Sequence, residues 1–363
     1  MCYTQFGKGM GVRKAFMNRF LLEPFLFGKG DVVAKNKVFM GPMTLNTANP
    51  DGTLNDWIVS WYEQRAAGGV GAIIGAAAAV HQSGFGWKNA MTIHSDRHIE
   101  GWRRCVDAAH AHGVLFGSQL YHSGAASSQK LLGTDPVAPS VWTRDGFDPA
   151  REMTEDEIYM VIAAFASGAR RSVDAGCDFI EIHGAHGYLV HQFTRRDVNR
   201  RTDLWGDLTA FPAAVVQAIR KEVGPDVPIM YRLSIHSDDP MSSDGPVSPE
   251  DLTHLIFVLE AAGVDVWDLS CHGDARRGFF GGAIMLPDWV RKTSAKPRIA
   301  AGNFFTFDNA DEYCADGYAE GVALARALIA DAHWVNNAYQ NKVGRSYSAQ
   351  TLADLHLGID PGI

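Results

Sequence analysis

Short apolar runs alternate with amphipathic helical segments along most of this chain. The apolar runs are nearly continuous, which is typical of parallel strands that are covered on both faces. Eight of them can be counted: KVFMGP from Lys37, GAIIG from Gly71, VLFGSQL from Val114, CDFIEIH from Cys177, PIMYRLS from Pro228, VDVWDLS from Val264, RIAAGN from Arg298 and EGVALA from Glu320. Eight strand–helix units predict an α/β protein with a single (β/α)₈ barrel, a TIM barrel, rather than an open doubly wound sheet.

The helical segments between these runs carry recognisable ends. Thr154 and Glu157 have the spacing of a capping box, and the helix that they begin is expected to stop at Gly176. Ser248 followed by Pro249 predicts the start of another helix. The interpretation as strand–helix repeats therefore rests on both kinds of element.

Composition limits the partners that the chain can have. A net charge of −8 over 363 residues argues against a nucleic-acid or anionic-membrane surface. The longest weakly polar stretch, Val70 to Val80, is too short to cross a bilayer. We therefore expect a small-molecule substrate, with no nucleic acid and no membrane, and the sequence leaves a homo-oligomer open.

Cysteine usage and the N-terminus bear on the compartment. The five cysteines are odd in number and scattered, without the spacing of a zinc or iron–sulfur site: Cys2, Cys105, Cys177, Cys271 and Cys314. They suit a reducing cytoplasm. Residues 1–19 lack the apolar core of a signal peptide and predict a flexible extension, which leaves 20–363 for the barrel.

Active sites of this fold lie where strands end and loops begin. The richest such segment is EIHGAHGYLVHQF, which crowds His183, His186 and Tyr188 at the end of the fourth run. Two imidazoles and a phenol can together hold an electron-rich oxygen and supply a proton. A metal site that adds His122 or His191 is the rival interpretation, a metal-dependent barrel hydrolase, which lacks an obvious carboxylate ligand at another strand end.

The last two runs end in small-residue turns, AAGN and LARAL. Backbone N–H groups in such turns often bind a phosphate in barrels, and Arg326 would add a charge-assisted bond. Gln119 and Arg232 end the third and fifth runs, where an amide and a cation could face an isoalloxazine ring.

Taken in order, these segments resemble the old yellow enzyme family from Phe20 to Trp334. The likeness is carried by FLLEPF, GPMT, YEQRAAGGVGAII, HIEGWRRCVDAAHAHG, QLYHSG, IHGAHGYLVHQF with NRRTDLWGD, YRLS, AAGN and ALARALIAD. It implies an FMN-dependent oxidoreductase, or ene-reductase, that takes hydride from NADH or NADPH. The acceptor would be the activated C=C bond of an α,β-unsaturated carbonyl or nitro compound.

The resemblance also implies roles for individual residues. His183 and His186 would bind the acceptor's oxygen, and Tyr188 would donate the proton. The flavin ring would contact Pro42, Met43, Thr44, Ala77, Gln119 and Arg232, and the FMN phosphate would contact Gly302, Asn303, Ala325 and Arg326.

Some positions depart from the family's pattern. Asn303 and Ala325 stand where glycine is usual, although Asn tolerates a left-handed backbone and Ala is small. TRRDVNRRTD replaces an LSP-type run after Phe193, and the loop residues Arg276 and Arg277 receive no role. Without a cysteine cluster, we expect direct transfer from nicotinamide to FMN to acceptor. A catalytically silent flavin-binding protein remains the third hypothesis.

Overall fold

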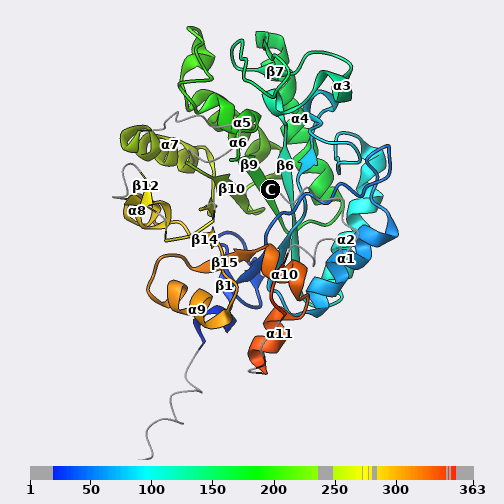
Figure 1. Ribbon diagram of the computed structural model, residues 1–363, viewed down its shortest axis with the longest axis vertical. Helices are drawn as coiled ribbons and strands as arrows, with labels where there is room; N and C mark the ends of the chain where they lie inside the picture. The colour runs from blue at the N-terminus through cyan, green and yellow to red at the C-terminus, as the bar shows by residue number, and fades with distance from the viewer. Residues whose placement is uncertain are drawn as a thin grey trace, which may run out of the picture.

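Eight parallel strands form a closed ring at the centre of the structure (Figure 1). This computed structural model describes residues 19–340 except 236–247, 272, 277 and 280–283, and also 342 and 345–348. Within those residues the ring consists of β3 (Val38–Met40), β4 (Ala72–Ile74), β6 (Leu115–Tyr121), β9 (Phe179–Gly184), β10 (Ile229–Leu233), β11 (Val266–Ser270), β14 (Arg298–Ala301) and β15 (Gly321–Leu324). The ring closes because β15 pairs with β3, β3 with β4, and β4 with β6. The predicted barrel and its eight strands are confirmed.

Helices follow the strands and surround them (Figure 1). In strand order they are α1 (Asp56–Ala67), α2 (Ile99–His110), α4 (Glu155–Asp174), α6 (Ala210–Val223), α7 (Pro249–Ala262), α8 (Leu286–Thr293), α9 (Phe307–Ala315) and α10 (Arg326–Ala330). The loops add α3 (Gln129–Leu132), α5 (Leu189–Phe193) and α11 (Trp334–Tyr339). No helix in the described part of the chain is long and apolar enough to span a membrane.

Short additional strands lie next to the barrel or in its loops. They are β1 (Phe25–Leu26) with β2 (Val33–Ala34), β5 (Ala78–Ala79) beside β6, β7 (Val137–Ala138) with β8 (Arg151–Glu152), and β12 (Gly278–Phe279) with β13 (Ile284–Met285). Single 3₁₀ turns occur at Phe20–Leu22, Gln82–Gly84, Asp96–His98, Gly124–Ala126 and Leu204–Gly206.

The predicted helix caps are present. Thr154 Oγ1 accepts a hydrogen bond from the N–H of Glu157 at 3.2 Å, and the Glu157 carboxylate accepts one from the N–H of Thr154 at 2.9 Å. Ser248 Oγ accepts a bond from the N–H of Asp251 at 3.0 Å, with Pro249 at the first turn of α7. Each cap satisfies N–H groups that the helix itself leaves without a partner.

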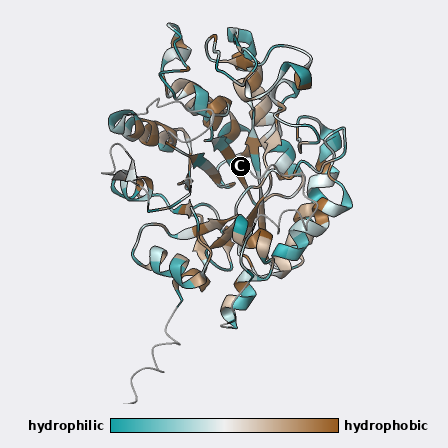
Figure 2. Ribbon diagram, in the orientation of Figure 1, coloured by the Kyte–Doolittle hydropathy of each residue, from teal (hydrophilic) through white to brown (hydrophobic). Residues whose placement is uncertain are grey.

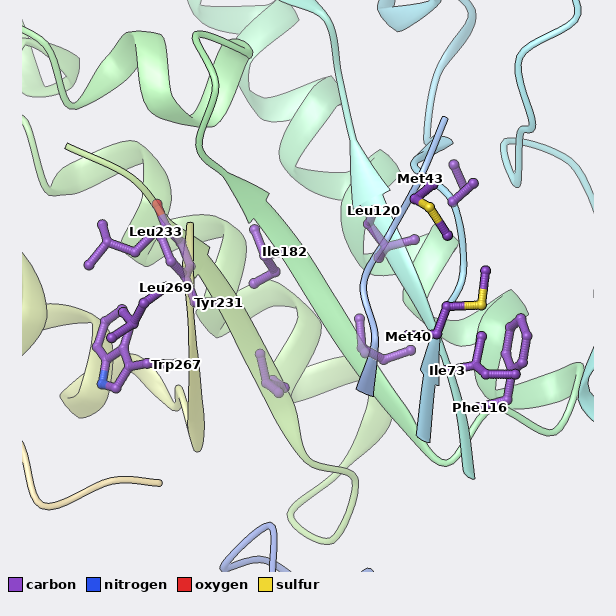
Figure 3. Close-up of a cluster of buried hydrophobic side chains, with 14 of the residues drawn as sticks. Met40, Met43, Ile73, Phe116, Leu120, Ile182, Tyr231, Leu233, Trp267 and Leu269 are labelled. Carbon is purple, nitrogen blue, oxygen red and sulfur yellow. The ribbon is translucent and has the colours of Figure 1, made fainter. Parts of the chain in front are cut away.

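Side chains on the strands alternate between two environments, as the period of two requires. One set packs outward against the helices and includes Ile182, Tyr231, Leu233, Trp267 and Leu269 (Figure 3). Figure 2 shows the strands as largely hydrophobic and the helices as mixed, which fits helices with one face on the barrel and one in water.

The other set points into the barrel, and its lower part is apolar. This apolar floor consists of Phe39, Ile74, Phe179, Met230, Val266 and Ile299. The β1–β2 hairpin closes the barrel beneath it, with the ring of Phe25 centred 5.0 Å from Phe39 and that of Phe27 centred 5.0 Å from Phe179. The hairpin thus covers this end, and active sites of this fold lie at the opposite end. The N-terminal extension predicted for residues 1–19 lies almost wholly outside the described residues, and the domain boundary stays a prediction.

Candidate functional site

Above the apolar floor the inward-facing positions become polar. Gln119 on β6, Glu181 on β9, Arg232 on β10 and Asp268 on β11 are each less than one-tenth exposed, and we call these four residues the polar layer. The strand register sets them side by side, because Gln119 pairs with Glu181 and Arg232 pairs with Asp268. Two of the four, Gln119 and Arg232, were expected at the flavin ring.

Hydrogen bonds within the polar layer are incomplete. Gln119 Nε2 donates to Glu181 Oε1 at 2.8 Å. Arg232 Nε lies 3.5 Å from Asp268 Oδ2 but donates no hydrogen bond to any described residue. Burial raises the pKa of Glu181 well above its usual range, and the charge of Asp268 raises it further. Burial likewise raises the pKa of Asp268, while the Arg232 charge opposes this shift.

The end of β9 and the turn that follows it bring His183, His186 and Tyr188 together, as the sequence predicted. The ring of His183 is centred 5.0 Å from that of His186 and 4.8 Å from that of Tyr188, both nearly perpendicular. His186 has a φ of +57°, a conformation that costs energy for a side-chain-bearing residue. Its N–H donates to Ser234 Oγ at 3.2 Å, and its Nε2 lies 2.7 Å from Ser270 Oγ, so two serines hold this turn.

His183 has a defined protonation state. Its Nδ1 accepts a hydrogen bond from the N–H of Ala185 at 3.3 Å. Burial lowers its pKa well below the usual value, and the charges of Arg232 and His191 lower it further. The ring is therefore neutral at physiological pH, with its proton on Nε2, and can act as a hydrogen-bond donor.

Tyr188 lies against an aromatic wall. Its half-buried ring is centred 5.6 Å from Tyr121 and 5.8 Å from Trp87. Ala77 belongs to the same cluster. These contacts fix the direction of the phenol ring while leaving part of the side chain accessible.

The segment after β3 contains three of the residues that were expected at the flavin ring. Met43 is buried, whereas Pro42 and Thr44 are half-buried. Met43 and Leu120, the outward neighbour of Gln119, belong to the same buried hydrophobic cluster (Figure 3). Their predicted backbone contacts with a flavin stay predictions.

A separate cavity of about 150 Å³ lies at the ends of β14 and β15. It is lined by Gly302, Asn303, Ala325 and Arg326, the four residues expected at the FMN phosphate, and also by Ser270. A Cβ at Gly302 would come within 2.5 Å of the backbone N of Ala275, so a side chain there would not fit. Asn303 has a φ of +47°, the left-handed conformation that Asn tolerates. The exposed Arg326 guanidinium donates to Asn303 Oδ1.

The histidines proposed as further metal ligands have other partners. His122 Nε2 bonds Ser83 Oγ at 2.9 Å, and its Nδ1 accepts a bond from the N–H of Gly124 at 3.1 Å. His191 Nδ1 accepts a bond from the N–H of Gly187 at 2.9 Å. The residues that the structure describes contain no group of three or more His, Cys, Asp or Glu arranged to hold a metal ion.

Other strand-end residues fall outside the site. Cys271 packs in the cluster between strands and helices, and burial raises its thiol pKa. Arg276 is exposed, with its guanidinium 5.2 Å from the centre of the Tyr313 ring. His272 and Arg277 lie outside the described residues.

Sequence reasoning missed several residues of the site. Ser270 contacts both the His186 ring and, at 3.5 Å, the Arg232 guanidinium, yet the sequence analysis assigned it no role. Glu181 and Asp268 were passed over inside runs treated as uniformly apolar. A charged residue within a buried strand was the available indication, because such a group is retained only where it has partners.

Comparison with known proteins gives a consistent result. The profile of the NADH:flavin oxidoreductase / NADH oxidase family matches residues 20–343. An NADH oxidase of Thermoanaerobacter brockii is 32% identical over 354 residues, which cover 92% of this chain and 53% of that protein. The chain thus spans about half the length of that relative. An NADPH dehydrogenase of Clostridium acetobutylicum is 32% identical over 311 residues, covering 83% of this chain and 89% of the dehydrogenase.

Among solved structures, the old yellow enzyme homologue from Zymomonas mobilis superposes with a TM-score of 0.79 at 26% identity. The match covers 91% of this chain and 95% of that one.

Proposed function

Because the chain belongs to the NADH:flavin oxidoreductase / NADH oxidase family, we propose that it reduces activated C=C bonds of α,β-unsaturated carbonyl or nitro compounds. The coarser function follows from the family: the chain is an NAD(P)H-dependent flavin oxidoreductase of the old yellow enzyme type, and its cofactors are FMN and NAD(P)H. The proposal adds the class of acceptor and the residues that act on it.

The residues present fit both the phosphate and the ring of FMN. Arg326 suits a phosphate because it can form a charge-assisted bond in the cavity that Gly302 also lines, and Gly302 leaves room for the backbone of Ala275 against this turn. The unsatisfied Nε of Arg232 suits the electron-rich pyrimidine edge of the ring, and Gln119 can present its amide there. When bound, FMN supplies hydride chemistry at its N5 atom.

His183 and His186 hold the acceptor's oxygen in this proposal. The neutral His183 ring donates through Nε2, and the His186 ring lies 5.0 Å away, which lets both approach one carbonyl or nitro oxygen. A hydrogen bond from a neutral imidazole strengthens as negative charge develops on that oxygen. Ser270 keeps the His186 ring in place through its 2.7 Å bond to Nε2.

Tyr188 supplies the proton to the α-carbon of the acceptor. Its phenol stands perpendicular to the His183 ring, on the side where Trp87 and Tyr121 form the aromatic wall. A tyrosine held in this way can reach a substrate whose oxygen is fixed by the histidines, and proton donation by a positioned side chain is general acid catalysis.

The meeting of His183, His186 and Tyr188 at the open end of the barrel carries the proposal. The test is anaerobic turnover of the full-length, FMN-loaded protein with NADH or NADPH and 2-cyclohexenone. We expect one cyclohexanone per nicotinamide oxidised. Bound FMN that is reduced by the nicotinamide but yields no saturated ketone from cyclohexenone or from a nitroalkene would overturn it and favour the silent flavin-binding protein.

A further inference from the structure

Two buried acids flank a single arginine inside the barrel. Glu181 and Asp268 are fully buried, and β10, which carries Arg232, lies between their strands. Apart from Arg232, the nearby titratable groups are His183, which pairs with Arg232 in the strand register, and Cys271, whose thiol pKa the charge of Asp268 raises. His183 is neutral for the reasons given above, and a buried thiol with a raised pKa is neutral too. The guanidinium of Arg232 is therefore the one cation available to two carboxyl groups among the described residues.

The carboxyl oxygens lack donors. Glu181 Oε2 and both carboxyl oxygens of Asp268 accept no hydrogen bond from any described residue, although none of them is reached by solvent. A buried acceptor without a donor is costly, and two buried carboxylates beside one cation would leave a net negative charge away from water. One proton between the two acids removes the excess charge and supplies a donor. Both side chains belong to the polar layer, with Glu181 bonded to Gln119 at 2.8 Å and Asp268 3.5 Å from Arg232, and each affects the pKa of the other, so one proton can serve both acids.

We propose that Glu181 and Asp268 share one proton, and that this pair sets the charge and orientation that Arg232 and Gln119 present to the flavin. Glu181 and Asp268 are then positioning residues, since they act through Arg232 and Gln119. Only the part of this inference that concerns the flavin rests on the proposed function. The shared proton itself is a property of the barrel.

The pair makes stability depend on pH in a definite direction. An ordinary Glu in the unfolded chain loses its proton near pH 4.3, whereas the folded protein keeps one, so folding takes up one proton above that pH. The native state binds more protons than the unfolded state, and stability therefore falls as pH rises. One proton corresponds to a tenfold rise in the unfolding constant per pH unit.

The first experiment measures urea unfolding of the full-length protein, at a fixed excess of FMN, from pH 5 to pH 7. Variants Glu181→Gln and Asp268→Asn each keep one acid for one arginine and need no extra proton. The ratio of the parent's unfolding constant to that of either variant should rise about tenfold per pH unit. Glu222→Gln, at an exposed carboxyl near the end of α6, is the matched control and should keep a constant ratio.

Two neutral substitutions at different positions guard against a folding defect in one of them. Constant ratios for both variants would overturn the shared proton. The result does not depend on reduction of an enone, so it fails or succeeds separately from the proposed function.

The second experiment follows the absorption band of bound FMN at pH values above 7, beyond the range in which the folded protein keeps the shared proton. Loss of the shared proton alters the charge beside Arg232, so the band should shift with pH in the parent and stay constant in Glu181→Gln. A band that titrates identically in both proteins would show that the pair does not act on the cofactor, and the positioning role would be wrong.

Discussion

Replacing Tyr188 by Phe isolates one hydroxyl group. Phe keeps the ring contacts with Trp87, Tyr121 and His183, so folding and FMN binding should be nearly unchanged. General acid catalysis typically contributes about 10²- to 10⁴-fold in rate, or roughly 3–5 kcal/mol of barrier. The loss should fall on the half-reaction with the enone alone, because reduction by the nicotinamide needs no proton from this side chain.

Stopped-flow absorbance of the two half-reactions measures this difference. Tyr121→Phe is the matched control, since the Tyr121 hydroxyl is already engaged as the acceptor of a 3.1 Å bond from the N–H of Gly86. We expect the control to reduce an enone within a few-fold of the parent rate. If Tyr188→Phe does the same while it remains folded and yellow, another group donates the proton and the assignment is refuted.

Two further substitutions test the contact with the FMN phosphate and the contact with the acceptor's oxygen. Arg326→Ala should weaken FMN binding by about 10- to 100-fold, the usual range for a hydrogen bond to a charged group, as measured by quenching of FMN fluorescence; unchanged affinity would remove Arg326 from the phosphate site. His183→Ala should raise the dissociation constant of a phenol by about tenfold or more in a titration of the flavin charge-transfer band. His110→Ala, on α2 at the outside of the barrel, should not change that constant, and equal curves for both variants would contradict the role of His183.

The barrel strands could be predicted because burial on both faces makes each run apolar along its whole length. Because the runs are apolar along most of their length, the few polar residues of the polar layer did not stand out in them. In the run CDFIEIH only the alternation of inward and outward positions separates Glu181, which faces the polar layer, from Ile182, which packs against helices. That alternation becomes meaningful once the closed ring is known, because which side is inside depends on strands distant in sequence.

The cluster after β9 was predictable because its three chemical groups lie within six residues. Ser270 was not, because its partners lie far away in sequence, His186 in the turn after β9 and Arg232 on β10. Successive residues of a strand also point to opposite faces, so an error of one residue at a strand end picks a side chain on the wrong face. The β1–β2 hairpin also escaped prediction, since its strands of two residues are too short to show a period.

The pairing of β15 with β3 has a consequence for how the protein is made. These two strands lie near opposite ends of the described chain, so β3 keeps an unpaired edge until Leu324 has left the ribosome. Synthesis at about 5–20 residues per second makes this wait last on the order of tens of seconds. During that time the partly built barrel exposes apolar strands to other nascent chains, and closing the ring also requires a contact of high sequence separation, which slows folding. We therefore expect the yield of folded protein to depend on chaperone capacity during translation more strongly than on the stability of the finished barrel.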